Sequence, residues 1–341
     1  MFARLTQISR HLPRNTSTTT LAAMTIDAFK KPVHTAACLI IGDEVLNGKT
    51  VDTNSSYFAK YCFDLGIELK RIEVIADDES EIIEAARRMS KNYDFVVTSG
   101  GIGPTHDDIT YPSLAAAFDS PLQLHEETAR RMREISAARP NAPSYDWDTP
   151  SAMLTARMRM AQLPSGPGTK VYFPCPSLWV PVAVVGGNVH VLPGIPRIFV
   201  LLLEGLRDIF LAEGRLDTSR KATRVMISTP MQESEVAEYL TELQERVKDR
   251  GVKVGSYPRW GATNNTITLV GSDTEYVESL VEEVEKATRG TRVTVEGENE
   301  EPEARSEEEK ANEAARNYGG ADKKERVVPC AIPEQTDPVK A

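Results

Sequence analysis

The segment SGGIGPTHDD brings glycines and aspartates together in one short loop. Gly100, Gly101 and Gly103 let backbone N–H groups approach an anion closely, as in loops that hold phosphate. Asp107 and Asp108 would repel a phosphate unless a divalent cation lay between them. The loop therefore predicts a phosphate site combined with a metal site. The simpler alternative is a tight turn before a helix that one of the aspartates caps.

Carboxylates also follow the two strands that are predicted before this loop. Asp43 and Glu44 come after the apolar run 35–41, and Asp77 and Asp78 come after the next strand. Loops that follow parallel strands emerge at one edge of a sheet, so these acids should meet the glycine loop in one crevice. Helix capping is the alternative for Asp77 or Asp78. The expected cofactor is a divalent metal, Mg²⁺, Mn²⁺ or Co²⁺, and the expected ligands are Asp43, Glu44, Asp107 and Asp108.

Other polar and turn residues are candidates for contact with a ligand. Asn54 and Ser55 stand at a predicted helix start, where capping is an equal alternative. His106 could donate to a phosphate oxygen or act as a general acid, although a loop histidine more often faces solvent. The LPGIP turn forms a crevice wall or simply joins a strand to a helix. The expected ligand-binding residues are Gly100, Gly101, Gly103, Thr105, Asn54, Ser55, Pro193 and Gly194.

Strand-like and helical segments alternate from the apolar run onward, which predicts a parallel sheet covered by helices on both faces. A later strand, helix, strand, strand, helix order predicts a small α+β domain. The predicted domains are a leader at 1–32, a first domain at 33–215, the α+β domain at 221–295 and a disordered acidic tail at 296–341.

Composition narrows the classes of function. The 341 residues carry a formal net charge of −10, which argues against nucleic-acid binding, and no apolar run is long enough to span a membrane. Arg4, Arg10 and Arg14 precede the first acidic residue, Asp27, which is typical of a mitochondrial transit peptide. The alternative is a disordered leader, with Met24 as a second start that gives a cytoplasmic form.

Four segments together resemble one known family: GDEVLNGKTVDTNSSYFAKYCFDLGIELKR, VIADDESEIIEAA, FVVTSGGIGPTHDDIT and VHVLPGIPRIF. They are similar to the molybdopterin-binding domain of the MoaB/Mog type, in the branch shared by CinA proteins and the N-terminal half of eukaryotic FAD synthase. The resemblance implies a three-layer α/β sandwich with a small C-terminal α+β domain, and a homo-oligomer. It also implies that two aspartates, matched here to Asp78 and Asp108, act in catalysis; we add His106 as a candidate.

This resemblance implies a metal-dependent nucleotide pyrophosphatase that acts on FAD or an ADP-ribose-like substrate. Two alternatives stay open: binding or adenylylation of molybdopterin, and a nucleotide sensor without catalysis. The expected partner is a small nucleotide or pterin, and the expected bound ligand is molybdopterin or FAD. FAD synthase continues into an adenylyltransferase domain, whereas this chain ends in an acidic tail. FMN adenylyltransferase activity is therefore not expected.

Overall fold

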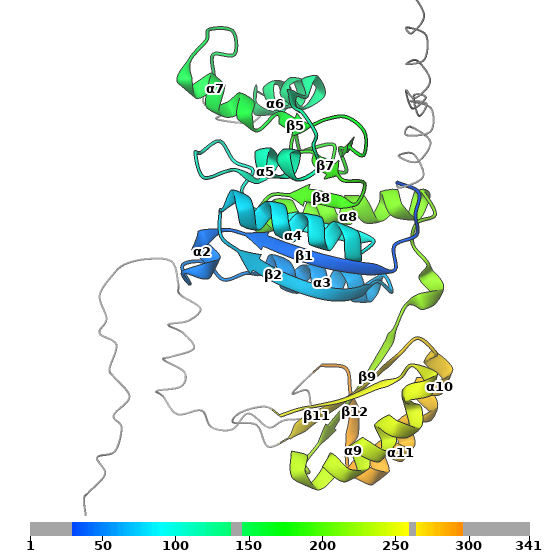
Figure 1. Cartoon of the computed structure of the whole chain (residues 1–341). Helices are drawn as coiled ribbons and strands as arrows, with labels where there is room; N and C mark the ends of the chain where they lie inside the picture. Colours follow the sequence, from blue (N-terminus) through cyan, green and yellow to red (C-terminus); the bar gives the residue numbers. More distant parts are fainter. Residues whose placement is uncertain (1–28, 138–144, 259–263, 296–341) are drawn as a thin grey trace, which may run out of the picture. The chain divides into compact units, whose positions relative to one another are not determined.

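The first strand of the larger sheet contributes side chains to two hydrophobic cores, one on each face of the sheet. In the computed structural model, which describes residues 29–137, 145–258 and 264–295, β1 (Thr35–Ile41) lies inside a six-stranded sheet (Figure 1). Successive side chains of a strand point to opposite faces, so an uninterrupted apolar run supplies two cores. Ala36, Cys38 and Ile40 join one core, and the alternate residues Ala37, Leu39 and Ile41 join the other.

The sheet has the strand order β2-β1-β3-β8-β7-β6. Its other strands are β2 (Glu68–Ile75), β3 (Phe95–Ser99), β6 (Lys170–Tyr172), β7 (Val182–Val185) and β8 (Val189–Leu192). Strands β2, β1, β3 and β8 run parallel, as predicted, but β7 and β6 are antiparallel to their neighbours. The prediction of a parallel sheet therefore holds for these four strands and does not extend to β7 and β6. Gly186 and Gly187 adopt positive φ angles in the turn between β7 and β8, and such residues favour a hairpin.

Helices cover both faces of this sheet and complete the predicted three-layer α/β sandwich. Helices α3 (Asn54–Asp64) and α8 (Pro196–Ala212) contribute to the first core. Helices α4 (Glu79–Asn92) and α5 (Thr110–Ala117) contribute to the second. The remaining elements of this part are α2 (Asp43–Leu46), β4 (Leu122–Leu124), α6 (Glu126–Ala137), α7 (Ala152–Arg159) and β5 (Gln162–Pro164), with β4 and β5 forming a separate antiparallel pair.

The C-terminal sheet has four strands in the order β10-β11-β9-β12. Its elements are β9 (Thr223–Thr229), α9 (Glu233–Val247), β10 (Lys253–Tyr257), β11 (Asn265–Gly271), α10 (Thr274–Ser279), α11 (Val281–Thr288) and β12 (Thr291–Val293), and two short 3-10 turns lie at Thr218–Arg220 and Lys248–Arg250. The arrangement is a small α+β fold. Val225, Ile227, Leu269 and Val284 are buried in it.

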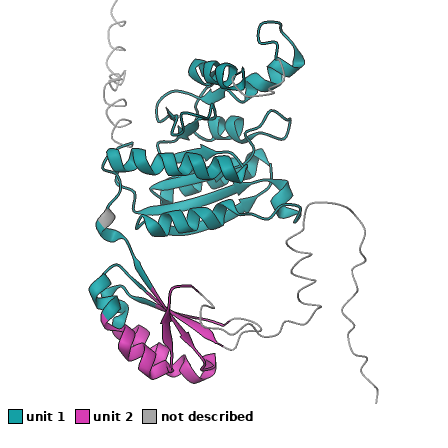
Figure 2. Ribbon diagram, turned by 180° about the vertical axis from the view of Figure 1, so that it is seen from behind, with its two compact units in different colours: residues 1–224, 247–253, 270–278 teal, residues 225–246, 254–269, 279–341 magenta. Residues whose placement is uncertain are grey.

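Contacts divide the chain into two compact units (Figure 2). The first comprises residues 1–224, 247–253 and 270–278, and the second comprises 225–246, 254–269 and 279–341. The predicted domain limits stay a prediction. The predicted transit peptide lies almost entirely outside the described residues, and the predicted tail lies wholly outside them. Among the described helices, none has the length and apolar character needed to cross a membrane.

Candidate functional site

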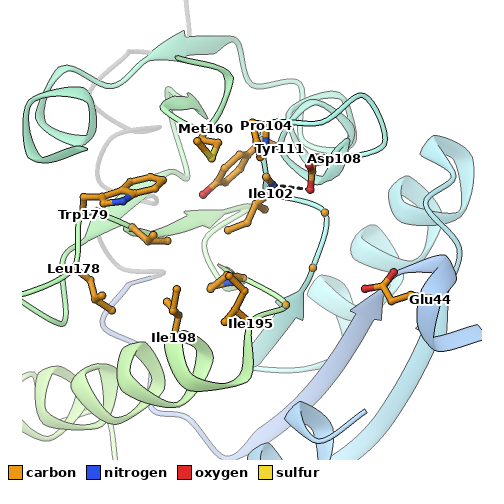
Figure 3. A pocket seen from close by; sticks show the side chains of 16 residues that line it. Glu44, Ile102, Pro104, Asp108, Tyr111, Met160, Leu178, Trp179, Ile195 and Ile198 are labelled. Atoms are coloured by element: carbon orange, nitrogen blue, oxygen red, sulfur yellow. Dashed lines mark hydrogen bonds between the residues drawn. The ribbon is translucent and has the colours of Figure 1, made fainter. Parts of the chain in front are cut away.

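A cavity of about 570 Å³ lies in the first unit, at the carboxyl ends of β3 and β8 (Figure 3). The chain visits β2 on one side of β1 and then β3 on the other, so this edge of the sheet is a topological switch point, where α/β proteins bind ligands. The glycine loop and the turn after β8 both line the cavity. Its lining from these two segments comprises Gly100, Gly101, Ile102, Gly103, Pro104, Pro193, Gly194 and Ile195.

The glycines of the loop are required by its close packing. Gly100 has a φ of 113° and Gly101 a φ of 64°, a region that favours glycine. A Cβ atom at Gly100 would collide with the carbonyl oxygen of Ile41, and one at Gly101 would collide with the Thr110 hydroxyl. The amide of Gly100 donates to the carbonyl of Leu192. The loop is therefore pressed between β1, α5 and the end of β8.

Asp108 closes this loop from within. Its carboxylate accepts hydrogen bonds from the N–H of Gly103 at 2.6 Å and the N–H of Thr105 at 2.8 Å, and also from the Thr105 hydroxyl. The donors that were expected to hold a phosphate are thus partly occupied by a carboxylate of the chain itself. Helix α5 begins at Thr110 after Ile109, without a side-chain cap. The predicted capping of this helix by an aspartate was wrong.

Asn54 joins three elements at the base of the cavity. Its side-chain amide donates to the Ser99 hydroxyl and to the carbonyl of Gly194, both at 2.9 Å. Ser99 ends β3, and Gly194 follows β8. Ser55, beside Asn54, donates its hydroxyl to Asp52, which also accepts from two N–H groups at the start of α3. Asn54 thus positions the cavity walls, whereas Ser55 belongs to the helix cap.

The adjacent acids Asp77 and Asp78 have different surroundings. Asp78 is exposed and caps α4, accepting from the N–H groups of Ser80 and Glu81. Asp77 is half-buried, and its Oδ1 lies 3.4 Å from the position that a Cβ at Gly101 would take. The structure therefore directs Asp77, rather than the predicted Asp78, toward the glycine loop. The capping pattern DESE, in which Asp78 precedes Ser80 and Glu81, was the signal in the sequence.

Burial, and then the charges of Asp43, Glu44 and Asp107, raise the pKa of Asp77 above its ordinary value, although the N–H of Asp43 donates to Asp77 at 3.0 Å. The folded chain therefore holds this proton more tightly than the unfolded chain does. Because the pKa of Asp77 is higher in the folded chain than in the unfolded chain, the free energy of unfolding falls as the pH rises from the unfolded to the folded pKa. At neutral pH the Asp77 charge destabilises the fold.

Asp77→Asn should raise the melting temperature at pH 7 by a few degrees, because it keeps an acceptor for the Asp43 N–H and removes the charge. Below about pH 3, under the usual aspartate pKa of about 3.9, the two proteins should melt together. Asp78→Asn is the matched control. Hydrogen bonds from Ser80 and Glu81 lower the pKa of Asp78, so its loss should lower the melting temperature at pH 7. Calorimetry at both pH values measures these shifts, and a gain from Asp77→Asn that persists at pH 3 contradicts the assignment.

The predicted metal ligands are not gathered into one set. Across residues 29–137, 145–258 and 264–295, no three His, Cys, Asp or Glu side chains are grouped closely enough to hold a metal ion. Glu44 and Asp108 line the cavity, but loop donors already engage both oxygens of Asp108. Asp43 contributes its backbone N–H to Asp77. As they stand, these residues do not fit a metal held by the protein alone.

His106 and Asp107 lie at the exposed tip of the loop. The His106 side chain is 97% exposed, and its Nδ1 is 4.0 Å from an oxygen of Asp107. A hydrogen bond from Thr105, with smaller contributions from His106 and Arg159, lowers the pKa of Asp107. Neither His106 nor Asp107 lines the cavity. A role of His106 in catalysis stays a prediction.

The opposite wall of the cavity was not predicted from the sequence. It is apolar, and its residues come from α5, the end of α7, the loop between β6 and β7, and α8: Tyr111, Met160, Leu178, Trp179, Val180 and Ile198. Figure 3 shows five of these side chains around the cavity, whose other side holds Glu44 and Asp108; the five are Tyr111, Met160, Leu178, Trp179 and Ile198. Trp179 stands in the largely apolar loop FPCPSLWVP, which carries no local signal that it returns to the cavity. The cavity thus has one side where the glycine backbone, Glu44 and Asp108 lie among a few apolar residues, and a second side that is apolar throughout.

Residues 37–211 match the family described as a probable molybdopterin binding domain, and residues 222–317 match the family described as the middle domain of FAD synthase. A probable FAD synthase from Caenorhabditis elegans is 34% identical over 252 residues, which cover 70% of this chain and 47% of that protein. Protein PH0439 from Pyrococcus horikoshii is 30% identical over 253 residues, which cover 73% of this chain and 94% of that protein. A CinA-like protein from Myxococcus xanthus is 34% identical over 202 residues, which cover 58% of this chain and 45% of that protein.

These matches correct one prediction. The absence of FMN adenylyltransferase activity was inferred from the point where the chain ends. Two matches carry the description FAD synthase, so this expectation was wrong. The chain spans about half the length of the FAD synthase and CinA-like relatives, and its end therefore carries no information about activity. By the match over residues 37–211 and by its relatives, this chain belongs to the molybdopterin-binding domain family, in the branch that includes CinA-like proteins and FAD synthases.

Proposed function

We propose that this chain binds a flavin dinucleotide such as FAD in the cavity and acts at its diphosphate bond. The observation that carries the proposal is the two-sided cavity, in which the glycine loop lies opposite an apolar wall. A nucleotide has the same division into charged phosphate and flat ring. The matches to FAD synthase support a flavin nucleotide as the substrate class. The volume of about 570 Å³ suits a ligand of this kind.

Hydrolysis is the reaction that the polar side of the cavity supports best. The oxygen of a water molecule forms a bond to one phosphorus atom while the bridging P–O bond breaks, and the leaving phosphate keeps the bonding electrons. Asp77, beside Gly101, takes the proton from the water. FAD would give FMN and AMP, and ADP-ribose would give ribose 5-phosphate and AMP. Because the described acids form no metal set of their own, the proposed divalent cation arrives bound to the diphosphate of the substrate.

Adenylyl transfer is a second candidate, favoured by the match of residues 222–317 to the FAD synthase middle domain. In this reaction a phosphate oxygen of FMN forms a bond to the α-phosphorus of ATP, and diphosphate leaves with the electrons of the broken P–O bond. The product is FAD. Both candidates make or break the same bond, so one binding mode of the flavin nucleotide serves either reaction.

Chromatography of the products distinguishes the two reactions. The full chain is incubated with FAD, with ADP-ribose, or with FMN and ATP, each in the presence of Mg²⁺, Mn²⁺ or Co²⁺. FMN and AMP from FAD identify hydrolysis, and FAD from FMN and ATP identifies synthesis. Asp77→Asn should slow hydrolysis about 100-fold or more, because loss of a general base removes about 10²–10⁴ in rate.

Asp78→Asn is the matched control, because it removes the neighbouring carboxylate that caps α4. Its turnover should stay within about twofold of the parent chain, since the N–H groups of Ser80 and Glu81 at the start of α4 already engage its carboxylate. Equal losses from the two substitutions would exclude Asp77 as the base. The absence of product from all substrates and metals would overturn the proposed function.

A further inference from the structure

Tyr111 carries a hydroxyl that the protein itself does not use. Only 4% of its surface is exposed, yet it lines the cavity. Within the described residues, no hydrogen bond engages this hydroxyl, and burial raises the pKa of Tyr111 above its usual range, so the proton stays on the oxygen at neutral pH. Figure 3 shows the hydroxyl reaching into the cavity toward the side where Trp179 lies. Because this side chain lines the cavity, its hydroxyl is free to donate a hydrogen bond to a ligand there.

Trp179 gives the same wall a flat aromatic surface. It stands in the loop between β6 and β7 and is half-buried, so part of its indole faces the cavity. Around it, Leu178, Val180 and Ile198 contribute hydrocarbon only. Aromatic faces bind flat rings by stacking, and hydrocarbon walls accept ring edges that carry no polar atoms. The wall therefore suits a planar ring with one apolar edge and one acceptor edge.

We propose that the apolar wall is a subsite for the isoalloxazine ring of a flavin, with Trp179 against the ring and the Tyr111 hydroxyl donating to its carbonyl edge. The isoalloxazine ring has a dimethylbenzene edge and a dione edge, which match this division. Adenine and pterin rings carry donors or acceptors around most of their edges, and these would stay unpaired against Leu178 and Val180. The inference rests on the proposed function, and it adds the residues that select the flavin end of the substrate.

Binding of FMN to the full chain tests the subsite without requiring turnover. Titration calorimetry gives the affinity, and quenching of flavin fluorescence reports stacking on Trp179. Tyr111→Phe should weaken FMN binding about 3- to 10-fold, which is the usual effect of losing one neutral hydrogen bond. Trp179→Ala should weaken it about tenfold or more and abolish part of the quenching, whereas Trp179→Phe should retain most of the affinity.

Two matched controls have the same chemistry elsewhere in the first unit. Tyr61 is also a buried tyrosine whose hydroxyl has no partner, but it packs in the first core. Trp147 is half-buried against Arg133 and Arg157 and does not line the cavity. Tyr61→Phe and Trp147→Ala should leave FMN affinity within about twofold. Circular dichroism of each variant establishes that it folds.

The outcomes separate this inference from the proposed function. FMN affinity that is unchanged in both Tyr111→Phe and Trp179→Ala overturns the subsite, even if the parent chain cleaves FAD. AMP binding that depends on Tyr111 and Trp179, with FMN binding independent of them, reassigns the wall to adenine and also overturns it. FMN binding that depends on both Tyr111 and Trp179 supports the subsite. If the chain then neither cleaves nor forms FAD, that result contradicts the proposed reaction and leaves the subsite in place.

Discussion

Gly100→Ala should lower the free energy of unfolding by about 2–6 kcal/mol, the largest stability effect we expect from one methyl group. The φ of 113° costs an alanine about 1–3 kcal/mol in strain. Its Cβ would also collide with the carbonyl oxygen of Ile41, which belongs to β1 and has no freedom to rotate away. Moving that backbone costs about 1–3 kcal/mol more. Urea unfolding followed by circular dichroism measures the change.

Gly48→Ala separates the two contributions to this loss. Gly48 has a φ of 75°, but a Cβ there would meet no atom within 4 Å. It should therefore show the strain alone, about 1 kcal/mol. If Gly100→Ala costs no more than Gly48→Ala, the glycine loop is free to move away from β1, and the close packing described for it is incorrect.

Asp108→Ala should reduce turnover of the proposed substrate about 100-fold, since small displacements of a binding loop have effects of this size. The carboxylate gathers the N–H groups of Gly103 and Thr105, so its loss leaves these two donors unpaired and releases the loop that lines the cavity. Steady-state kinetics with FAD measures the loss. Asp108→Asn, which keeps one acceptor oxygen, should recover part of the activity.

The metal dependence of these variants distinguishes loop closure from metal binding. If Asp108 shapes the loop, the concentration of divalent cation at half-maximal rate should be the same in the parent chain, Asp108→Ala and Asp108→Asn. A ligand of the metal would behave differently, because its removal raises the cation concentration required. An increase of about tenfold or more in both variants would restore Asp108 to the predicted metal role.

Much of the fold could be predicted from the sequence, because its signals are local. The apolar run of β1 needs a covered sheet on both sides, and the amphipathic helix α4 needs one buried face. The antiparallel hairpin at Gly186 was missed because two apolar runs of similar length look the same in either direction. Its glycine pair carried the missing information.

The candidate site was predictable in place but not in detail. Strand ends in a parallel sheet fix where the glycine loop and the turn at Gly194 lie, and both segments line the cavity. The choice between Asp77 and Asp78 depends on which carboxylate the start of α4 engages, and that is a matter of side-chain direction. The contribution of Trp179 depends on a loop that returns to the site from distant sequence, which no local pattern describes.

The hydrogen bond from Asn54 to Gly194 spans 140 positions of the chain. During synthesis on a ribosome, the donor Asn54 emerges long before the acceptor Gly194. The cavity therefore cannot be completed until residue 194 has left the exit tunnel. Until then the Asn54 side chain has no Gly194 carbonyl to hold, and the glycine loop lacks the Leu192 carbonyl that accepts from Gly100. The walls of the cavity are thus assembled late in the synthesis of the first 200 residues.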